Sequence, residues 1–288
     1  MAGPVEALVC CRDSTLTSDH GHQLFCKFWR SSDDKPRRLI FISHGLAEHC
    51  QRYDDLAVPL AQHDNFVYAH DHVGHGRSEG DRVHVTDFSI YVDDVIKHIE
   101  MLKKEHPGVP CFMFGHSMGG LITILTTLRA PDLLKGIVLS GPAITHDSNI
   151  VTPLKTFLAK AVAMIWPQYE FASVGSEVIC RDEKVVYYYN EDQLVWHGGI
   201  KAKWFSCIMA AMEEVQTRFR EIKTPYLLLH GSADQLCSIE GSKMMHANTS
   251  SEDKTFKIYE GCYHEVLWEI DGQGKQAIKD VVDWIENR

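Results

Sequence analysis

Short uninterrupted runs of apolar residues recur along the chain, and between them apolar residues are often spaced three or four positions apart. An apolar run of this length is typical of a strand covered on both faces, whereas the wider spacing is typical of one helix face. Residues 24–29 differ because their side chains alternate, as in a strand near a sheet edge. We predict strands at residues 24–29, 39–42, 66–69, 111–114, 136–140, 225–229 and 255–259.

The wider spacing predicts helices between these strands. The longest predicted helix carries apolar residues from Phe88 to Leu102, with Thr86 as its N-cap. Residues 1–22 are polar, and we expect them to be loosely held. Further helices are predicted from about residue 119, at residues 240–247 and around residues 278–285.

Strands that alternate with helices predict an α/β fold, in which a mostly parallel, doubly wound sheet has right-handed crossovers. The chain has 288 residues, and we expect one domain over residues 1–288. The alternation lapses at about residues 142–190, which we interpret as a helical cap inserted over the open end of the sheet.

The cap contains a helical stripe of apolar residues. Its members are Leu154, Phe157, Leu158, Ala161, Val162 and Ile165. One interpretation is that this stripe packs against the core. The other is that it faces a channel for an acyl chain and touches lipid, with Lys155 and Lys160 at the level of the head groups.

The composition limits the kinds of molecule that the protein is expected to bind. The net charge is −10, which argues against nucleic-acid binding and against simple electrostatic attachment to anionic lipid. No stretch approaches the roughly 18 apolar residues of a spanning helix. The nine cysteines show no C-x-x-C pairing, so free thiols in the cytoplasm are expected.

A G-x-S-x-G motif lies between the predicted strand at 111–114 and the helix that follows it. The motif is Gly115-His116-Ser117-Met118-Gly119. A serine on such a sharp strand-to-helix turn is held in a strained conformation that exposes its hydroxyl, and flanking glycines remove clashes. We therefore predict that Ser117 is a nucleophile.

A serine nucleophile needs a base, and the base needs a carboxylate to orient it. In a parallel sheet these groups follow the carboxyl ends of strands. Asp234 and His264 follow the last two predicted strands. The order Ser117, Asp234, His264 is the order of the α/β-hydrolase triad.

An acyl-transfer site also needs donors for the oxyanion. The N–H of Met118, next to the nucleophile at the start of a helix, is one candidate. The second should lie in a loop after an early strand, where His44-Gly45-Leu46-Ala47 offers the N–H of Leu46.

A group of histidines resembles a metal site at first sight. His70, His72 and His75 surround Asp71, but Gly74 stands where an H-x-H-x-D-H motif would need an aspartate. We therefore predict no metal site, and we expect these side chains to fix a polar turn.

Taken in order, the motifs resemble the monoacylglycerol lipase family of α/β-hydrolases. The resemblance covers about residues 20–285. It rests on residues 43–49, Arg52-Tyr53, residues 70–80, residues 115–120, residues 231–234 and residues 259–264. It implies hydrolysis of a monoacylglycerol to a fatty acid and glycerol, no cofactor, a mobile apolar cap and peripheral contact with membranes.

The same resemblance implies residues for the glycerol head group. Glu48 and Arg52 match the head-group side, Tyr189 a tyrosine near the glycerol exit, and Cys237 a thiol that lines the pocket. A surface ion pair, a packed aromatic ring and an inert cysteine remain the alternatives for these positions.

Two positions depart from the family pattern. Ala47 replaces a glycine, so we expect a tighter oxyanion loop. Leu267 replaces a histidine that helps to hold the head group, so we expect weaker selection of glycerol esters.

The sequence thus predicts a serine ester hydrolase. A lysophospholipase or general carboxylesterase on the same triad, and a non-catalytic lipid-binding scaffold on the same fold, remain alternatives. Acyl-chain preference and oligomeric state are left open.

Overall fold

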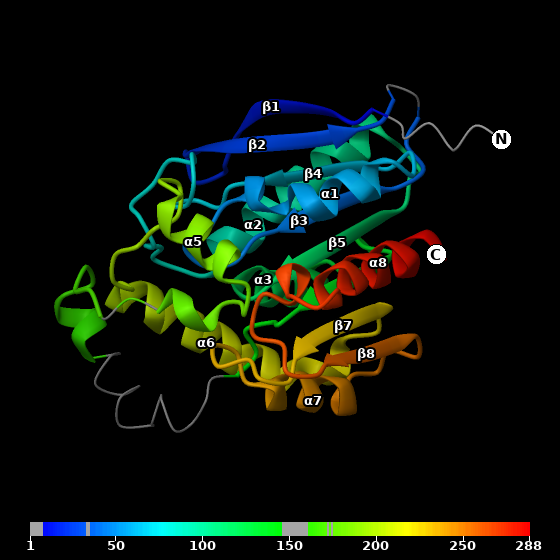
Figure 1. Cartoon of the computed structure of the whole chain (residues 1–288). Helices are drawn as coiled ribbons and strands as arrows, with labels where there is room; N and C mark the ends of the chain where they lie inside the picture. The colour runs from blue at the N-terminus through cyan, green and yellow to red at the C-terminus, as the bar shows by residue number, and fades with distance from the viewer. Residues whose placement is uncertain (1–7, 33–34, 146–160, 172, 174) are drawn as a thin grey trace.

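One eight-stranded sheet runs through the computed structural model, which describes residues 8–32, 35–145, 161–171, 173 and 175–288 (Figure 1). The strand order is β1-β2-β4-β3-β5-β6-β7-β8. Neighbours from β4 to β8 pair in parallel, whereas β2 is antiparallel to both β1 and β4. The strands are β1 (Cys10–Thr17), β2 (Gln23–Arg30), β3 (Leu39–Ser43), β4 (Phe66–His70), β5 (Cys111–His116), β6 (Gly136–Ser140), β7 (Tyr226–Gly231) and β8 (Lys254–Tyr259).

Helices cover both faces of this sheet. They are α1 (Asp54–Ala61), α2 (Ser89–Glu105), α3 (Met118–Arg129), α5 (Glu183–Glu191), α6 (Ala202–Arg218), α7 (Ile239–Asn248) and α8 (Gln273–Glu286). Short 3₁₀ turns are η1 (Cys50–Tyr53), η2 (Ser176–Val178), η3 (Phe219–Glu221) and η4 (Val266–Trp268). The predicted α/β fold with a mostly parallel sheet is confirmed.

Alternate residues of the central strands belong to two separate cores. Phe41 and Met113 pack on the side of α2, α3 and α6. Ile40 and Phe112 point to the other face, where α1 and α8 cover them. All four side chains are fully buried, which explains why the apolar runs are unbroken in the sequence.

Two expectations about the N-terminal half were wrong, and one helix there was not predicted. Residues 10–17 are not loosely held but form β1, whose side chains are almost all exposed at the sheet edge and therefore show no apolar pattern. Helix α1 was not predicted. Thr86 is not the N-cap of α2, because that helix begins at Ser89, whose N–H donates to Asp87 Oδ1 at 2.8 Å.

The segment that we interpret as a cap connects β6 to β7 in the sequence, and α5 and α6 lie in this connection, at the carboxyl end of the parallel strands (Figure 1). Leu154, Phe157 and Leu158, with Lys155 and Lys160, lie outside the described residues. Within the described part of the predicted stripe, Ile165 is 87% exposed. Helix α6 lies beyond the predicted end of the insertion, and its buried face joins the larger core.

Among the helices of the described segments, none is both long and apolar enough to cross a membrane.

Candidate active site

Ser117 lies between the last residue of β5 and the first residue of α3. Its φ of 53° and ψ of −117° put a non-glycine residue in a strained region of backbone space. Two glycines allow this turn. A Cβ at Gly115 would overlap the carbonyl of Gly119, and a Cβ at Gly119 would overlap the carbonyl oxygens of Ser43 and His44. The helix therefore starts in direct backbone contact with the end of β3.

His264 and Asp234 form a buried pair beside this turn. The Nδ1 atom of His264 lies 2.7 Å from Oδ2 of Asp234. The other oxygen of Asp234 accepts the N–H groups of Leu236 and Cys237 at 2.8 and 3.0 Å. His230 Nε2 lies 3.2 Å from Oδ2 of the same carboxylate. These contacts fix the carboxylate and, through it, the orientation of the His264 ring.

The pair also sets the charge states of the site. Burial opposes ionisation of Asp234, but His264 and His230 outweigh it and hold the pKa of this carboxyl well below its usual range. Burial likewise works to lower the pKa of His264, and the charge of Asp234 outweighs it, so that this pKa is raised. His264 is thereby a stronger base than a free imidazole.

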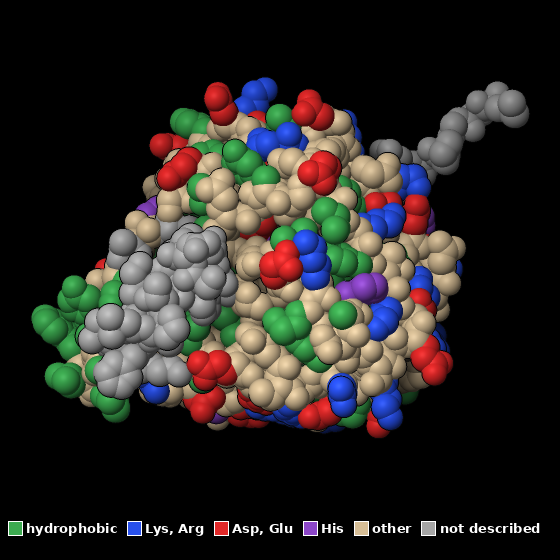
Figure 2. Space-filling model, turned by 90° about the horizontal axis from the view of Figure 1, so that it is seen from below, with side chains coloured by type: hydrophobic (Ala, Val, Ile, Leu, Met, Phe, Trp, Pro, Cys, Tyr) green, Lys and Arg blue, Asp and Glu red, His purple; other side chains and the backbone are tan. Residues whose placement is uncertain are grey.

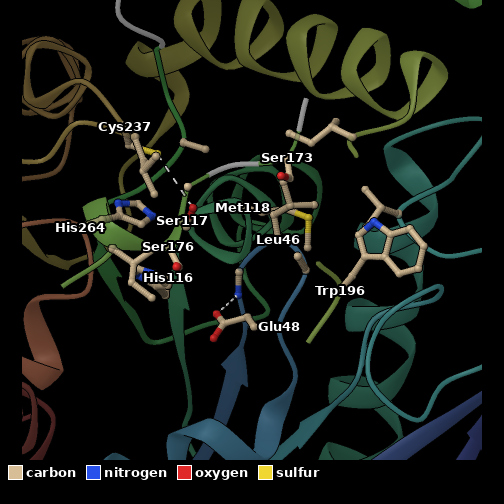
Figure 3. A pocket seen from close by; sticks show the side chains of 18 of the residues that line it. Leu46, Glu48, His116, Ser117, Met118, Ser173, Ser176, Trp196, Cys237 and His264 are labelled. Carbon is tan, nitrogen blue, oxygen red and sulfur yellow. Dashed lines mark hydrogen bonds between the residues drawn. The ribbon is translucent and has the colours of Figure 1, made fainter. Parts of the chain in front are cut away.

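Ser117 and His264 line the same cavity, and Figure 3 shows the His264 ring beside the Ser117 side chain. Cys237 also lies close to Ser117, with its Sγ atom 3.9 Å from Ser117 Oγ (Figure 3). Burial raises the pKa of the Cys237 thiol well above its ordinary value, with the charge of Asp234 adding to the effect. A thiol in this state is a poor nucleophile.

The two backbone N–H groups predicted to hold the oxyanion are those of Met118 and Leu46. Met118 opens α3, and Leu46 lies in the loop after β3. Among the described residues, neither N–H has a hydrogen-bond acceptor. Glu48 holds this loop, because its Oε1 atom accepts the N–H of Gly45 at 2.5 Å.

Ala47 occupies a position that favours glycine. Its φ of 67° lies in the left-handed region, where alanine is more strained than glycine. Its carbonyl accepts the N–H of Trp196 at 2.8 Å, which ties the loop to the segment between α5 and α6.

The cavity has a volume of about 620 Å³, in the range of sites for small ligands. One wall is apolar and comes mainly from α6 and the segment before it. Its members include Trp196, Ile200, Trp204, Phe205, Ile208, Met209 and Met212. Nothing in the sequence assigns these residues to the cavity, because their spacing is equally that of a core helix.

The opposite side of the cavity is polar. Glu48, Arg52, Tyr189 and Cys237, which the resemblance implied, all line the cavity, and so does Glu265. Arg52 donates to Glu48 and makes a two-pronged ion pair with Glu265 at 2.7 and 2.9 Å. Burial works against ionisation of Glu48, but Arg52 outweighs it and lowers the pKa of Glu48 to about 2.

Leu267 is not among the cavity-lining residues of the described chain. It is 4% exposed in turn η4 and packs in the core with α8. The structure therefore does not bring it to the predicted head-group side. The ring of its neighbour Trp268 lies against Arg52 instead, at 5.0 Å.

The histidine group at residues 70–75 is buried beneath the oxyanion loop. The N–H of His72 donates to His44 Nε2 at 2.9 Å, and His70 shares a hydrogen bond of 3.2 Å with His98. Burial lowers the pKa of His70 and His72 well below the ordinary value. Within the described ranges, no group of three or more His, Cys, Asp or Glu residues has the arrangement of a metal site.

Known proteins resemble this chain over most of its length. A family model described as serine aminopeptidase, S33 (Hydrolase_4) matches residues 34–271. The monoglyceride lipase of Rattus norvegicus is 38% identical over 95% of this chain and 90% of its own length. The monoacylglycerol lipase of Mycolicibacterium smegmatis is 35% identical over 94% of this chain and 98% of its own. The crystal structure of the Paleococcus ferrophilus monoacylglycerol lipase superposes with a TM-score of 0.80 at 31% identity, covering 91% of this chain and 97% of that one.

Proposed function

We propose that this chain, which belongs to the monoglyceride lipase family of serine hydrolases, cleaves monoacylglycerols to a fatty acid and glycerol. The observation that carries the proposal is the position of Ser117. It lies on a strained turn beside the His264–Asp234 pair and opens into an apolar cavity.

The reaction proceeds in two acyl-transfer steps. Ser117 Oγ attacks the ester carbonyl while His264 Nε2 takes the serine proton, and the oxyanion is held by the N–H groups of Leu46 and Met118. The tetrahedral intermediate collapses, the C–O bond to glycerol breaks, and His264 gives its proton to the leaving alcohol. Water, deprotonated by His264, then attacks the acyl-enzyme and releases the fatty acid and the free serine.

Asp234 stays ionised throughout. It holds the Nδ1–H of His264, so that Nε2 is the atom that exchanges the proton, and it stabilises the imidazolium formed in each step. No residue of this cycle requires a cofactor.

The apolar wall supplies the preference for an acyl chain. Each methylene buried against the α6 side chains contributes about 0.8 kcal/mol, which corresponds to roughly a fourfold gain in kcat/KM. The polar side, with Glu48, Arg52 and Tyr189, lies where the alcohol part leaves. Its contacts with glycerol hydroxyls are direct or through water.

Contact with a membrane surface is part of this proposal. Met164, Ile165 and Trp166 are 81%, 87% and 63% exposed, and Tyr169 beside them is 43% exposed. Figure 2 shows hydrophobic side chains gathered at the cap, next to the residues left undescribed. Exposed aromatic and aliphatic side chains of this kind are suited to the boundary between head groups and acyl chains.

A hydrolysis panel on one acyl chain tests the function. The substrates are monooleoylglycerol, lysophosphatidylcholine with an oleoyl chain, methyl oleate and a soluble butyryl ester, with Ser117→Ala as the control for background hydrolysis. We expect the highest kcat/KM for monooleoylglycerol. A preference for the lysophospholipid or the butyryl ester would assign the chain to a lysophospholipase or a general carboxylesterase.

The scaffold alternative is tested by fluorophosphonate labelling. An activated Ser117 reacts, whereas a folded chain that binds lipid without catalysis does not.

A further inference from the structure

Glu265 follows the catalytic base directly, and the triad mechanism gives it no task. Its carboxylate is nevertheless 3% exposed and forms both prongs of the ion pair with Arg52. A buried bidentate pair fixes the orientation of both partners, because two parallel N–H···O bonds define a plane. The ion pair therefore holds the Glu265 side chain in a single orientation.

Arg52 links Glu265 to the loop that bears Leu46. Its Nη1 atom also donates to Glu48, four residues earlier in the chain. Glu48 in turn accepts the N–H of Gly45 at 2.5 Å and the hydroxyl of Tyr53 at 2.6 Å. Gly45 immediately precedes Leu46, so a continuous set of hydrogen bonds joins the loop of the base to the loop of the oxyanion donor.

Two aromatic rings lie against the same guanidinium group. The centre of the Arg52 guanidinium lies 4.9 Å from the ring of Tyr189 in the α5 helix and 5.0 Å from the ring of Trp268. The N–H of Glu265 donates to the carbonyl of Ile179, which lies in the cap segment before α5, at 2.7 Å. These contacts restrict the movement of Arg52, whose side chain is 11% exposed where it lines the cavity.

We propose that Glu265 is a positioning residue that, through Arg52, fixes the loop bearing His264 against the loop bearing the oxyanion N–H of Leu46. This inference rests on the proposed function, because it assigns these two loops their roles in ester hydrolysis. Separating the base from the oxyanion donor by a fraction of an ångström slows acyl transfer, since a misplacement of about 1 Å costs up to a hundredfold.

The charge of Glu265 gives the inference an independent signature. The charged and titratable groups facing His264 are Asp234, Glu265 and Glu48, together with the His116 ring at 4.6 Å. Burial lowers the pKa of His264, and the negative charges of Asp234, Glu265 and Glu48 act in the opposite direction. Removing the charge of Glu265 therefore lowers this pKa, whereas a purely structural defect leaves it unchanged.

The test uses Glu265→Gln in the full chain. Two rates are followed against pH: inactivation of Ser117 by a fluorophosphonate, and turnover of a soluble butyryl ester. We expect the plateau rates to fall about tenfold, the KM for the ester to change by less than about twofold, and the acid limb to move to lower pH. Glu265→Asp should restore the acid limb and part of the rate.

A matched control is Glu286→Gln. Glu286 forms a part-buried ion pair with Arg38 at 3.1 Å at the end of α8, and it does not line the cavity. This substitution should lower the melting temperature and leave both kinetic profiles unchanged. If Glu265→Gln behaves like Glu286→Gln, the inference is wrong.

Arg52→Lys keeps the positive charge but loses the planar fork, and it serves if Glu265→Gln does not fold. It should lower both rates without moving the acid limb; unchanged rates would overturn the inference. A wild-type chain that does not react with the fluorophosphonate would overturn the proposed function and this inference together. A reactive wild type in which Glu265→Gln changes neither the plateau rates nor the acid limb overturns the inference alone.

Discussion

Oδ2 of Asp234 lies 2.7 Å from Nδ1 of His264, although the two residues are supplied by loops after different strands. The first prediction concerns this contact. Asp234→Asn keeps the shape of the site but no longer fixes the tautomer of His264. We expect kcat to fall about 10⁴-fold, as the loss of the orienting carboxylate does in a serine triad. The measurement is turnover of the butyryl ester, with circular dichroism as the check on folding.

The sign of the pH dependence follows from the same pair. His264 must be neutral to accept the serine proton, so activity should rise as pH increases through its pKa. Because Asp234 raises that pKa in the folded protein, the acid limb of kcat/KM should lie above the ordinary histidine value. An acid limb below the ordinary value would contradict the assignment of His264 as the base.

The second prediction concerns Ala47. Its left-handed backbone costs about 1–2 kcal/mol for an L-residue, and glycine relieves this at an entropic cost of about 0.5–1 kcal/mol. We expect Ala47→Gly to raise the free energy of unfolding by up to about 1 kcal/mol, measured by urea unfolding. The control is Ala57→Gly in the α1 helix, where glycine should destabilise by about 1 kcal/mol or more. Destabilisation by both changes would mean that the loop is not strained.

The third prediction tests the exposed part of the cap. Ile165→Ser combined with Trp166→Ser removes two large apolar side chains that lie mostly in solvent. We expect weaker binding to vesicles and a KM several-fold higher for monooleoylglycerol in vesicles, with the soluble butyryl ester unaffected. Flotation of vesicles with the protein measures binding directly. Equal losses on both substrates would indicate a folding defect.

The fourth prediction concerns stability in acid. Burial lowers the pKa of His98 to about 3, whereas the unfolded chain binds this proton near the ordinary value. Stability from this ring is therefore complete at neutral pH and is lost as pH falls below about 6.5, by roughly 1.4 kcal/mol per pH unit. His98→Phe should reduce this slope, measured by urea unfolding between pH 7 and about pH 5.

The absolute stability of His98→Phe does not test the fourth prediction. The change leaves Nδ1 of His70 without its partner, so the variant should be less stable at neutral pH. An acid slope equal to that of the wild type would show that His98 is already protonated in the folded chain.

The sequence predicted the site best where a rule links chain position to space. Ser117 and Asp234 follow the buried strands β5 and β7, and His264 follows the partly exposed edge strand β8; the carboxyl ends of these parallel strands meet at one edge of the sheet. The central strands were recognised because they are covered on both faces. Strand β1 is mostly exposed, so its sequence has no apolar pattern from which a strand could be predicted.

The sequence failed where the direction of a side chain depends on a local turn. In η4, two adjacent residues differ: Leu267 enters the core, whereas the ring of Trp268 lies against Arg52. No periodicity distinguishes these directions in a turn of three residues. One feature of the sequence pointed to Glu265. It is an acidic residue directly after the catalytic base His264, in addition to Asp234.

The contact at Gly119 has a consequence for how this enzyme can change. The carbonyl groups that a Cβ there would meet belong to Ser43 and His44, which lead into the oxyanion loop. The spacing between nucleophile and oxyanion donor is thus set by a position with no side chain at all. A single methyl group added at Gly119 would increase the distance between the nucleophile and the oxyanion donor without contacting either of them. Variation in substrate choice is therefore expected in the cap and in the cavity wall.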